Sequence, residues 1–506
     1  MTIDRQGALV LRDARVGSAI VDLLVDRGVI VDIVPAGSEL RGVDGKAEEV
    51  SLQGRWLGPG LWDNHVHFGQ WSLLRQRIDV SGATSAREAA AIVSAALVGS
   101  EHNPFVGVGF RGGLWPDEPG LEILDPATGV VPVVLISADL HAVWLNSAAL
   151  ARFGHTGHPT GLLREESAFE VIRRLDTAVE GQLDLWVDAA AREAARRGVV
   201  GIVDLEMDWN LDTWNRRIAA GTGSLRVEFG IYPQDLDRAI ALGLRTGQRI
   251  GDLLTVGPFK VITDGSLNTR TAYCFDAYPG LTGPDSHGLL AVQAEELEQL
   301  ILRATDAGLT PAVHAIGDRA NSIVLDLFER VGAFGKRGKM PGIRGRIEHA
   351  QLLATRDVSR FAELGIVASV QPEHAMDDRD VADRYWAGRT DRSFVLRSLL
   401  DAGVELAFGS DAPVAPLDPW VTIAAAVDRS REGREPWHPE QAISVEESIA
   451  ASSRTRVAVG EPADLVITDV DPTAIDPLMG TGDRLRSMPV SGTLLGGRWT
   501  HNELGG

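Results

Sequence analysis

Two histidines one residue apart, His65 and His67, are the residues of this chain best suited to bind a metal ion. They follow an apolar segment that enters through Pro59 and Gly60. In a β-strand, residues i and i+2 point to the same face, so the two imidazoles can converge on one ion. Neutral imidazole is a common ligand of zinc and similar divalent cations. Because such pairs also arise by chance, the weight of this one depends on partners elsewhere in the chain.

Further residues with suitable chemistry occur in similar surroundings. Most lie in or just after an apolar run rich in β-branched residues, as expected of a buried parallel strand leaving its sheet. They are Lys260, His314, His349 and Asp411. Taken singly, a buried His or Asp is usually a hydrogen-bonded structural residue, and a lone Lys is usually a surface charge. The argument therefore depends on their order along successive strands.

Alternating apolar segments and helical patterns predict a parallel α/β fold. The expected strands are residues 57–67, 199–205, 225–232, 257–264, 310–315, 345–350, 365–372 and 404–411. The expected helices are residues 86–98, 186–197, 294–307, 320–331, 355–364 and 393–402. Because eight strands are expected and residues of catalytic type lie at their carboxyl ends, a (β/α)8 barrel is favoured over an open sheet.

The order His-x-His, Lys, His, His, Asp resembles that of the amidohydrolase superfamily, metal-dependent hydrolases on a (β/α)8 barrel. Three segments are similar to the YtcJ-like branch, which includes N-substituted formamide deformylases: Asp139–Leu150, Lys260–Ala272 and Val370–His374. Two departures concern the substrate rather than the metal. Asp139-Leu-His-Ala replaces the usual Asp-Gly-His-Ser, and Asn268-Thr269 stands where that branch often has Gly-Ser.

The resemblance also implies a domain organisation. Residues 56–455 are expected to form the barrel, and residues 1–55 and 456–506 a composite β-sandwich built from both chain ends. Short strands with glycine-bearing turns in both end segments agree with this. The gap between the first two barrel strands is too long for a loop. Residues 100–190 are therefore expected to form an inserted cap subdomain after strand 1.

By resemblance, the site holds two divalent ions, with zinc as the first choice and manganese, iron, cobalt and nickel left open. The implied ligands are His65, His67 and Asp411 for the buried ion, His314 and His349 for the exposed ion, and Lys260 between them. An ammonium group cannot ligate a cation. Lys260 would therefore act as its N6-carboxylated form, whose two oxygens can bridge both ions.

The chemistry expected of such a site is hydrolysis of a carbon–nitrogen bond. Water shared by the ions loses a proton near neutral pH and attacks the substrate carbonyl. Asp411 can take the proton and pass it to the leaving amine. Other expected contributors are His374 as a hydrogen-bonding catalytic residue, and His141, Trp144, Arg270, Trp115 and Trp71 in substrate binding. Packing or loop-fixing roles are the alternative for each. Asp318 and Glu348 are candidates to orient the imidazoles.

Composition excludes several classes of partner. The net charge is −21, from 49 Lys and Arg against 70 Asp and Glu, which argues against nucleic acid as a ligand. No membrane span or secretion signal is visible. The single cysteine, Cys274, rules out an internal disulfide and fits a reducing cytoplasm. We expect a cytoplasmic enzyme acting on a small amide, with a homodimer as the default assembly.

Two alternatives remain open at this stage. The first is a mononuclear enzyme on the same barrel with other chemistry, such as deamination, lactone opening or decarboxylation. The second is a non-catalytic relative that keeps the barrel for assembly or regulation. Such proteins usually lose ligands, whereas all six expected ligands are present here.

Overall fold

The computed structural model describes residues 7–41, 47–98, 104–177, 180–332, 345–475 and 481–504. The chain divides into two compact units. The first comprises Met1–His67, Asp188–Gly265 and Ala272–Gly506, and the second comprises Phe68–Val187 and Ser266–Thr271.

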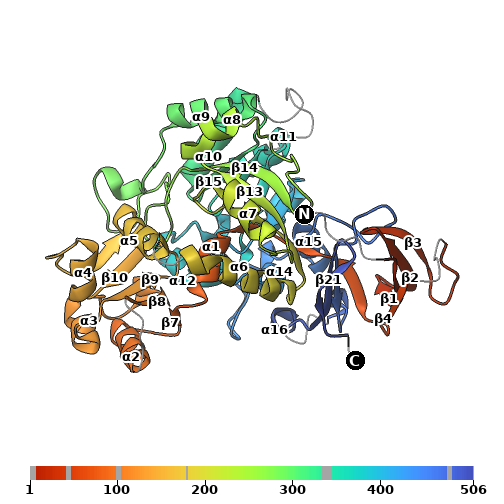
Figure 1. Cartoon of the computed structure of the whole chain (residues 1–506). Helices are drawn as coiled ribbons and strands as arrows, with labels where there is room; N and C mark the ends of the chain where they lie inside the picture. The colour runs from red at the N-terminus through yellow and green to blue at the C-terminus, as the bar shows by residue number, and fades with distance from the viewer. Residues whose placement is uncertain are drawn as a thin grey trace. The chain divides into compact units, whose positions relative to one another are not determined.

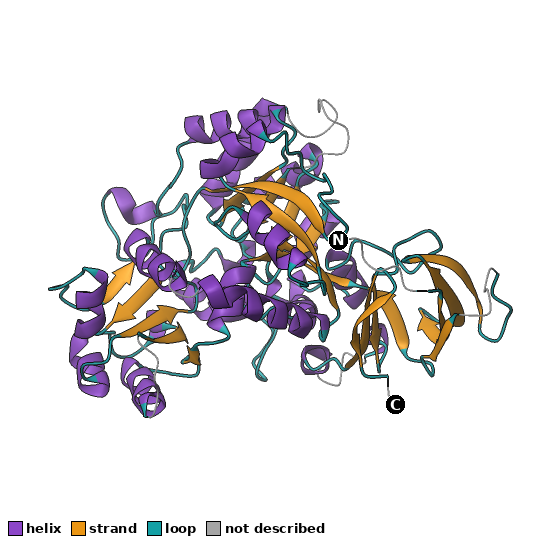
Figure 2. Ribbon diagram, in the orientation of Figure 1, coloured by secondary structure: helices purple, strands orange, loops and turns teal. Residues whose placement is uncertain are grey.

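Eight parallel strands form the central sheet of the first unit (Figure 2). In sheet order they are β18 (Leu406–Phe408), β17 (Val367–Val370), β16 (Arg346–His349), β15 (Pro311–Ala315), β14 (Leu254–Ile262), β13 (Arg226–Ile231), β12 (Val199–Asp204) and β6 (Leu61–Val66). Every residue of β6, β12 and β15 is buried. Burial on both faces explains why β12 reads as a nearly continuous apolar run and not as an alternating pattern.

Backbone hydrogen bonds bring the first and last strands of this sheet together. The amide of Asp411 donates to the carbonyl of His65 at 2.7 Å, and the amide of His67 donates to the carbonyl of Ala412 at 2.8 Å. The sheet is thereby nearly closed, which confirms the expected (β/α)8 barrel.

Helices connect the barrel strands and follow the last of them. They are α7 (Asn210–Ala219), α8 (Leu236–Ala241), α9 (Ala294–Asp306), α10 (Asp318–Val331), α11 (Val358–Leu364), α12 (Pro372–Tyr385), α13 (Leu396–Asp401), α14 (Pro419–Asp428), α15 (Val445–Ala451) and α16 (Thr481–Arg486). Helix α6 (Glu180–Ala195) precedes β12 and contains the boundary between the units. No helix among the described residues is both long and apolar enough to cross a bilayer.

A second sheet of the first unit is built from both ends of the chain, as expected. Along its path lie β21 (Arg498–Asn502), β20 (Val490–Leu495), β19 (Leu465–Thr468), β5 (Trp56–Pro59), β1 (Leu9–Val16), β2 (Ala19–Asp26) and β3 (Val29–Pro35), while β4 (Glu48–Ser51) pairs with β1. In Figure 1 the red N-terminal strands and the dark-blue strand β21 lie in the same part of the molecule.

The single strand expected over residues 57–67 is in fact two strands, β5 and β6. Strand β5 pairs with β19 of the chain-end sheet, whereas β6 pairs with β12 of the barrel. The chain changes sheets at Gly60, where a Cβ atom would lie 2.5 Å from the side chain of Val200. Only a residue without a side chain fits this close approach.

The second unit is a layered α/β structure. Its sheet has the order β11 (Leu162–Arg164), β10 (Ala142–Leu145), β9 (Val133–Ser137), β8 (Phe105–Phe110) and β7 (Ile78–Asp79). Its helices are α1 (Phe68–Leu74), α2 (Ala86–Leu97), α3 (Leu121–Thr128), α4 (Ser147–Phe153) and α5 (Glu166–Thr177).

Alternate residues of β9 separate the two cores of this unit. Val133 and Leu135 pack with α2 and α3, while Val134 and Ile136 pack with α4 and α5. This is the two-residue periodicity of a strand covered on both faces. The insertion after barrel strand 1 begins at Phe68, well before the expected residue 100. That it covers the barrel mouth stays a prediction.

A buried ion pair ties the chain-end sheet to the barrel. Arg226 of β13 donates from Nε and Nη2 to the two carboxylate oxygens of Asp464, at 2.7 and 2.9 Å. The Asp464 side chain is 3% exposed. Its backbone carbonyl also accepts from the amide of Gly60 at 2.8 Å.

We expect Asp464→Ala to lower the free energy of unfolding by about 3 kcal/mol, because it leaves the Arg226 guanidinium without its carboxylate in a largely buried position. Urea titration followed by circular dichroism measures the change. Asp469→Ala, which removes a half-exposed partner of Arg55, is the matched control and should cost about 1 kcal/mol or less. Equal losses in the two variants would contradict the structural role of Asp464.

Candidate metal centre

The carboxyl ends of the barrel strands gather the predicted metal-binding side chains. His65 is the next-to-last residue of β6, His314 is the next-to-last of β15, and His349 ends β16. Lys260 lies two residues before the end of β14, and Asp411 follows β18. Because all these strands run parallel, their carboxyl ends lie on one side of the barrel. All five residues are buried.

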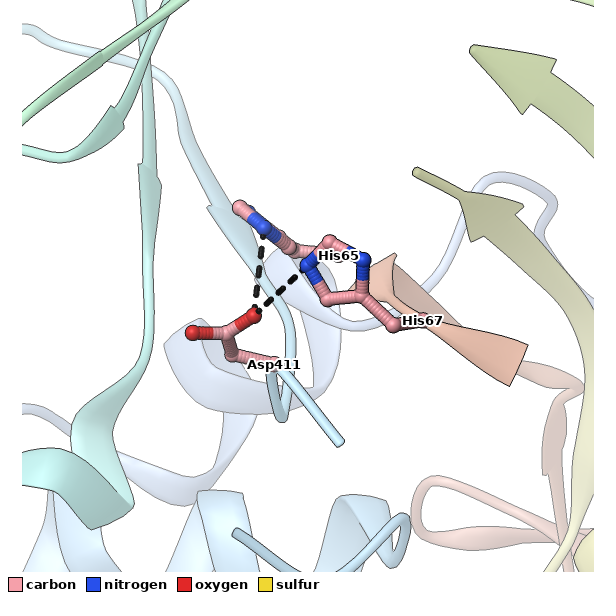
Figure 3. Close-up of side chains that lie close together, drawn as sticks. All are labelled: His65, His67 and Asp411. Carbon is pink, nitrogen blue, oxygen red and sulfur yellow. Dashed lines mark ion pairs between the residues drawn. The ribbon is translucent and has the colours of Figure 1, made fainter. Parts of the chain in front are cut away.

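His65, His67 and Asp411 form one compact group, shown in Figure 3. Oδ1 of Asp411 lies 3.3 Å from Nε2 of His65 and 3.4 Å from Nε2 of His67. Charge-assisted hydrogen bonds are shorter, about 2.7–2.9 Å. Two ligand atoms bound at about 2.1 Å to one tetrahedral ion are instead roughly 3.4 Å apart. The spacing therefore matches three ligands that surround a common divalent cation.

Unpaired imidazole nitrogens support the same interpretation. Among the described residues, buried imidazole nitrogens without a hydrogen-bond partner are His67 Nδ1, His155 Nε2, His314 Nε2, His349 Nδ1 and His374 Nε2. Buried polar atoms in folded proteins are normally paired, and each exception needs an explanation. For His314, His349 and His374, whose rings lie close together, a lone pair offered to a cation is such an explanation. His155 belongs to neither group of candidate ligands, and His67 faces Asp411 through its other nitrogen, Nε2. The three neighbouring imidazoles therefore fit a metal centre.

A second group consists of His349, His374 and Asp411, each of which offers a ligand atom within 4.8 Å of the others. His374 is the third residue of α12, and its Nε2 atom lies 3.9 Å from Oδ2 of Asp411. His314 belongs to neither group of three. Its Nε2 atom lies 3.4 Å from Oδ1 of Asp264. The assignment of His314 and His349 to one ion stays a prediction.

Glu348 fixes the orientation of His65. Its Oε2 atom accepts from Nδ1 of His65 at 2.6 Å, which leaves the lone pair of Nε2 free for a metal ion. Burial and the nearby Lys260 ammonium lower the pKa of His65 to about 4, so the ring is neutral at pH 7. Of the two residues expected to orient imidazoles, Glu348 contacts one. Asp318 instead accepts from the amide of Phe275 and from Arg392.

The charge of Glu348 is balanced by Arg346. This arginine is two residues earlier in β16 and forms an ion pair with Glu348. It also donates to the carbonyl of Asn64 at 2.6 Å and to Oγ of Ser369 at 2.8 Å. Burial raises the pKa of Glu348, but Arg346 and His65 outweigh it and hold that pKa well below its ordinary value. The carboxylate is therefore ionised at neutral pH.

Lys260 lies beside the first group, with its Nζ atom 3.4 Å from Nε2 of His65. The side chain is fully buried. Burial lowers its pKa to about 8, even though Glu348 and Asp411 favour the charged form. Half of the amine is thus neutral near pH 8. Only the neutral amine can react with carbon dioxide.

Two residues that sequence reasoning missed hold the first group in place. Oδ1 of Asp63 accepts from the amides of His65 at 3.1 Å and Ser410 at 3.0 Å, so it joins the loops that carry the ligands. At Gly409 a Cβ atom would lie 2.6 Å from the amide nitrogen of His65. The spacing Asp63-x-His65 is typical of an Asp that binds the backbone two residues later, and it could have indicated this role.

Two of the candidate ligands have a strained backbone. His349 and Asp411 have φ values of 73° and 57°, in the left-handed region that non-glycine residues rarely adopt. Such conformations cost about 1–3 kcal/mol each and persist at functional sites where surrounding contacts impose them. The strain therefore agrees with a functional role of these two residues.

The predicted substrate-binding residues lie in the second unit. Nδ1 of His141 is paired with Oε2 of Glu165 at 2.9 Å, a partner that sequence reasoning did not identify. Arg270 is half-buried in the segment Ser266–Thr271. Neither residue is in either group of three, and their contacts with substrate stay predictions.

The three predicted tryptophans are packed within the second unit. Trp144 is fully buried in the core beside α2 and α3, with its ring edge-on to Phe110. This position agrees with the packing role that was the alternative for Trp144, and its contact with substrate stays a prediction. Trp115 donates from Nε1 to the carbonyl of Ala83 at 3.1 Å. Trp71 is 8% exposed and packs against Phe68.

We expect Glu348→Gln to weaken zinc binding by about 10–100-fold, because a neutral amide leaves Arg346 unpaired and holds the His65 ring less firmly. Competition with a chromophoric chelator measures the affinity. Glu363→Gln, at an exposed position of α11, is the control and should bind zinc as the wild type does. Unchanged affinity in Glu348→Gln would show that His65 is oriented without this carboxylate.

Comparisons with known proteins agree with this geometry. The chain is 32% identical to the protein LONG AFTER FAR-RED 3 from Arabidopsis thaliana over 80% of its length and 74% of that protein. It is 27% identical to an N-substituted formamide deformylase from Arthrobacter pascens, over 94% of both chains. These relatives confirm the resemblance inferred from the motifs.

A solved structure confirms the fold. The crystal structure of an uncharacterized metal-dependent hydrolase from Pyrococcus horikoshii matches with a TM-score of 0.75 at 24% identity, over 94% of this chain and 99% of that one. The model of the family described as "Amidohydrolase family" matches residues 48–501. The chain therefore belongs to the amidohydrolase family.

Proposed function

We propose that this member of the amidohydrolase family is a metal-dependent hydrolase that cleaves the carbon–nitrogen bond of a small N-substituted amide or formamide. The observation that carries the proposal is the group of His65, His67 and Asp411, whose ligand atoms surround a common point at metal-ligand spacing. The relation to an N-substituted formamide deformylase over nearly the full length of both chains supports this choice of bond.

When bound, a divalent ion lowers the pKa of coordinated water and polarises a carbonyl oxygen. The protein's own residues orient the ligands and transfer the proton. Glu348 holds His65 with its Nε2 lone pair free for ligation. Burial raises the pKa of Asp411, but His65, His67 and His349 outweigh it and keep the pKa well below its ordinary value. The ionised Asp411 can take a proton from the attacking water and deliver it to the leaving nitrogen.

Lys260 is proposed to act as its N6-carboxylate, placed to bridge two ions. The neutral amine adds to the carbon of carbon dioxide, loses a proton to water and becomes an anion with two oxygen donors. Its burial, the lowered pKa and the position 3.4 Å from Nε2 of His65 support this proposal. A lysine with an ordinary pKa would be almost fully protonated at pH 7 and unreactive.

Substrate binding is proposed to involve His141 and Arg270, which lie in the second unit. His141, with Glu165 as its partner, is the strongest candidate in the second unit, because the carboxylate fixes the tautomer and orientation of the ring. Arg270 would bind a carboxylate or carbonyl group of the substrate. Contacts of this kind determine which small molecule is the substrate.

The function is tested with zinc-loaded protein and a panel of N-substituted formamides, N-acyl amines, amino-heterocycles and lactones. Amine release from the first two classes is the expected result, with activity lost on chelation and restored by zinc. We expect Asp411→Asn to lower kcat by at least about 100-fold. Asp391→Asn, at an exposed position, is its control. His67→Ala should abolish turnover.

Two outcomes would contradict this proposal. Wild-type turnover in metal-replete Asp411→Asn would remove the assigned proton transfer. Activity on amino-heterocycles or lactones alone would exclude amide hydrolysis in favour of deamination or lactone opening.

Carboxylation of Lys260 has its own pH dependence. The reactive neutral amine is present above the pKa of about 8 and is lost as the pH falls through that value. After removal of metal and carbon dioxide at low pH, we expect labelled bicarbonate to be incorporated faster as the pH rises from 7 to about 8. A carbamate resonance in 13C NMR, absent from Lys260→Ala, measures incorporation. Incorporation that is equal in Lys260→Ala would refute the modification of this residue.

A further inference from the structure

A short segment after barrel strand β14, Ser266–Thr271, belongs to the second unit, although the residues on both sides of it belong to the first. The segment is a compact turn. The amide of Arg270 donates to the carbonyl of Leu267 at 2.9 Å. The hydroxyls of Thr269 and Thr271, which flank Arg270, are hydrogen-bonded to each other at 2.6 Å. Arg270 is therefore presented by a turn whose residues are bonded to one another.

Glu165 interacts both with His141 and with this turn. Its Oε2 atom is paired with Nδ1 of His141 at 2.9 Å. Burial raises the pKa of Glu165, but His141 and the nearby hydroxyls of Thr269 and Thr271 outweigh it and hold that pKa below its ordinary value. The other oxygen, Oε1, is buried and has no hydrogen bond of ordinary geometry among the described residues, so the hydroxyls act on the carboxylate through their dipoles. One ionised carboxylate thus attracts the ring of His141 and the two residues on either side of Arg270.

The backbone around His141 is fixed by the same residue. The amide of Glu165 donates to the carbonyl of His141 at 2.9 Å. On the other side, Oδ1 of Asp139 accepts from the amide of His141 at 3.2 Å. The His141 ring lies edge-on to Phe169 of α5, with the ring centres 5.4 Å apart. Glu165 therefore holds His141 through its side chain and its backbone together.

The three parts of this network each contain a strained residue. Leu140, Glu165 and Arg270 have φ values of 63°, 50° and 60°, and among the described residues of the second unit they are the non-glycine residues with positive φ. Such a conformation costs about 1–3 kcal/mol and persists where surrounding contacts impose it, often at ligand-binding sites. Leu140 also stands where the related motif usually has glycine. Strain beside His141, at its partner and at Arg270 points to one functional cluster.

We propose that Glu165 is a positioning residue that holds both candidate substrate-binding residues, His141 and Arg270, in one arrangement. The inference rests on the proposed function, in which these two residues bind the substrate, and adds the residue on which both depend. Without the carboxylate, the His141 ring loses its partner and the turn around Arg270 loses a charge that stabilises it. Because Glu165 acts through other side chains, its loss should weaken substrate binding and leave the chemical step nearly unchanged.

Hydrogen exchange followed by mass spectrometry tests the positioning without turnover. In Glu165→Gln we expect peptides that cover Ser266–Thr271 to exchange at least about 10-fold faster than in the wild type. Glu165→Ala is a second variant, and circular dichroism establishes that both are folded. Glu166→Gln is the matched control, because this neighbouring carboxylate is exposed and pairs with Arg173. It should exchange as the wild type does. Unchanged exchange in both Glu165 variants would overturn the positioning role.

Kinetics test the consequence for substrate binding. With the N-substituted formamide that the wild type hydrolyses fastest, we expect Glu165→Gln to raise KM by at least about 10-fold and to change kcat by less than about 3-fold. In the His141→Ala, Arg270→Ala double variant, Glu165→Gln should have no further effect, because both residues through which it acts are gone.

The contrary outcomes separate this inference from the proposed function. A fall in kcat at unchanged KM, or an equal effect of Glu165→Gln in the double variant, would overturn the positioning role and leave the hydrolase proposal standing. A wild type that hydrolyses no amide or formamide would overturn the proposed function, and the exchange experiment would still decide the role of Glu165.

Discussion

The backbone pairing between the first and last barrel strands is the interaction on which the site depends. The amide of Asp411 meets the carbonyl of His65, and the amide of His67 meets the carbonyl of Ala412. These two hydrogen bonds close the sheet and bring a carboxylate beside two imidazoles. The approach is close enough to require glycine at position 409. Closure of the sheet and assembly of the site therefore depend on the same residues, since His65, His67 and Asp411 form these hydrogen bonds and are also candidate ligands.

Around this seam the buried carboxylate of Glu348 has a counterion. Arg346 balances Glu348, which in turn orients His65. Burying a charge without a partner costs several kcal/mol, so a network of this kind is stable only when complete. Lys260 lies within the same network, and burial brings its pKa to about 8. Next to this network, the rings of His314, His349 and His374 keep an unpaired nitrogen each.

The two compact units carry different candidate residues. The barrel supplies strand ends, which are rigid positions for ligands whose geometry must hold within a fraction of an ångström. The second unit, with its own sheet and cores, carries His141 with its partner Glu165. Substrate choice in barrel enzymes is set by segments outside the barrel strands. The departures from the family motifs at Leu140 and Asn268 fall in this unit, which agrees with a substrate of its own.

The sequence by itself determined the barrel strands, because β-branched runs are local patterns; the strand expected over 257–264 is Leu254–Ile262. It also predicted the candidate ligands at the strand ends, and their binding of metal stays a prediction. Only the tertiary structure decided which distant groups meet. Glu348 contacts His65 across 283 residues of chain, and the two oxygens of Asp411 face different histidines. The split of residues 57–67 at Gly60 likewise depends on pairing with β19. Such contacts arise from strand register and backbone closure, which no local pattern encodes.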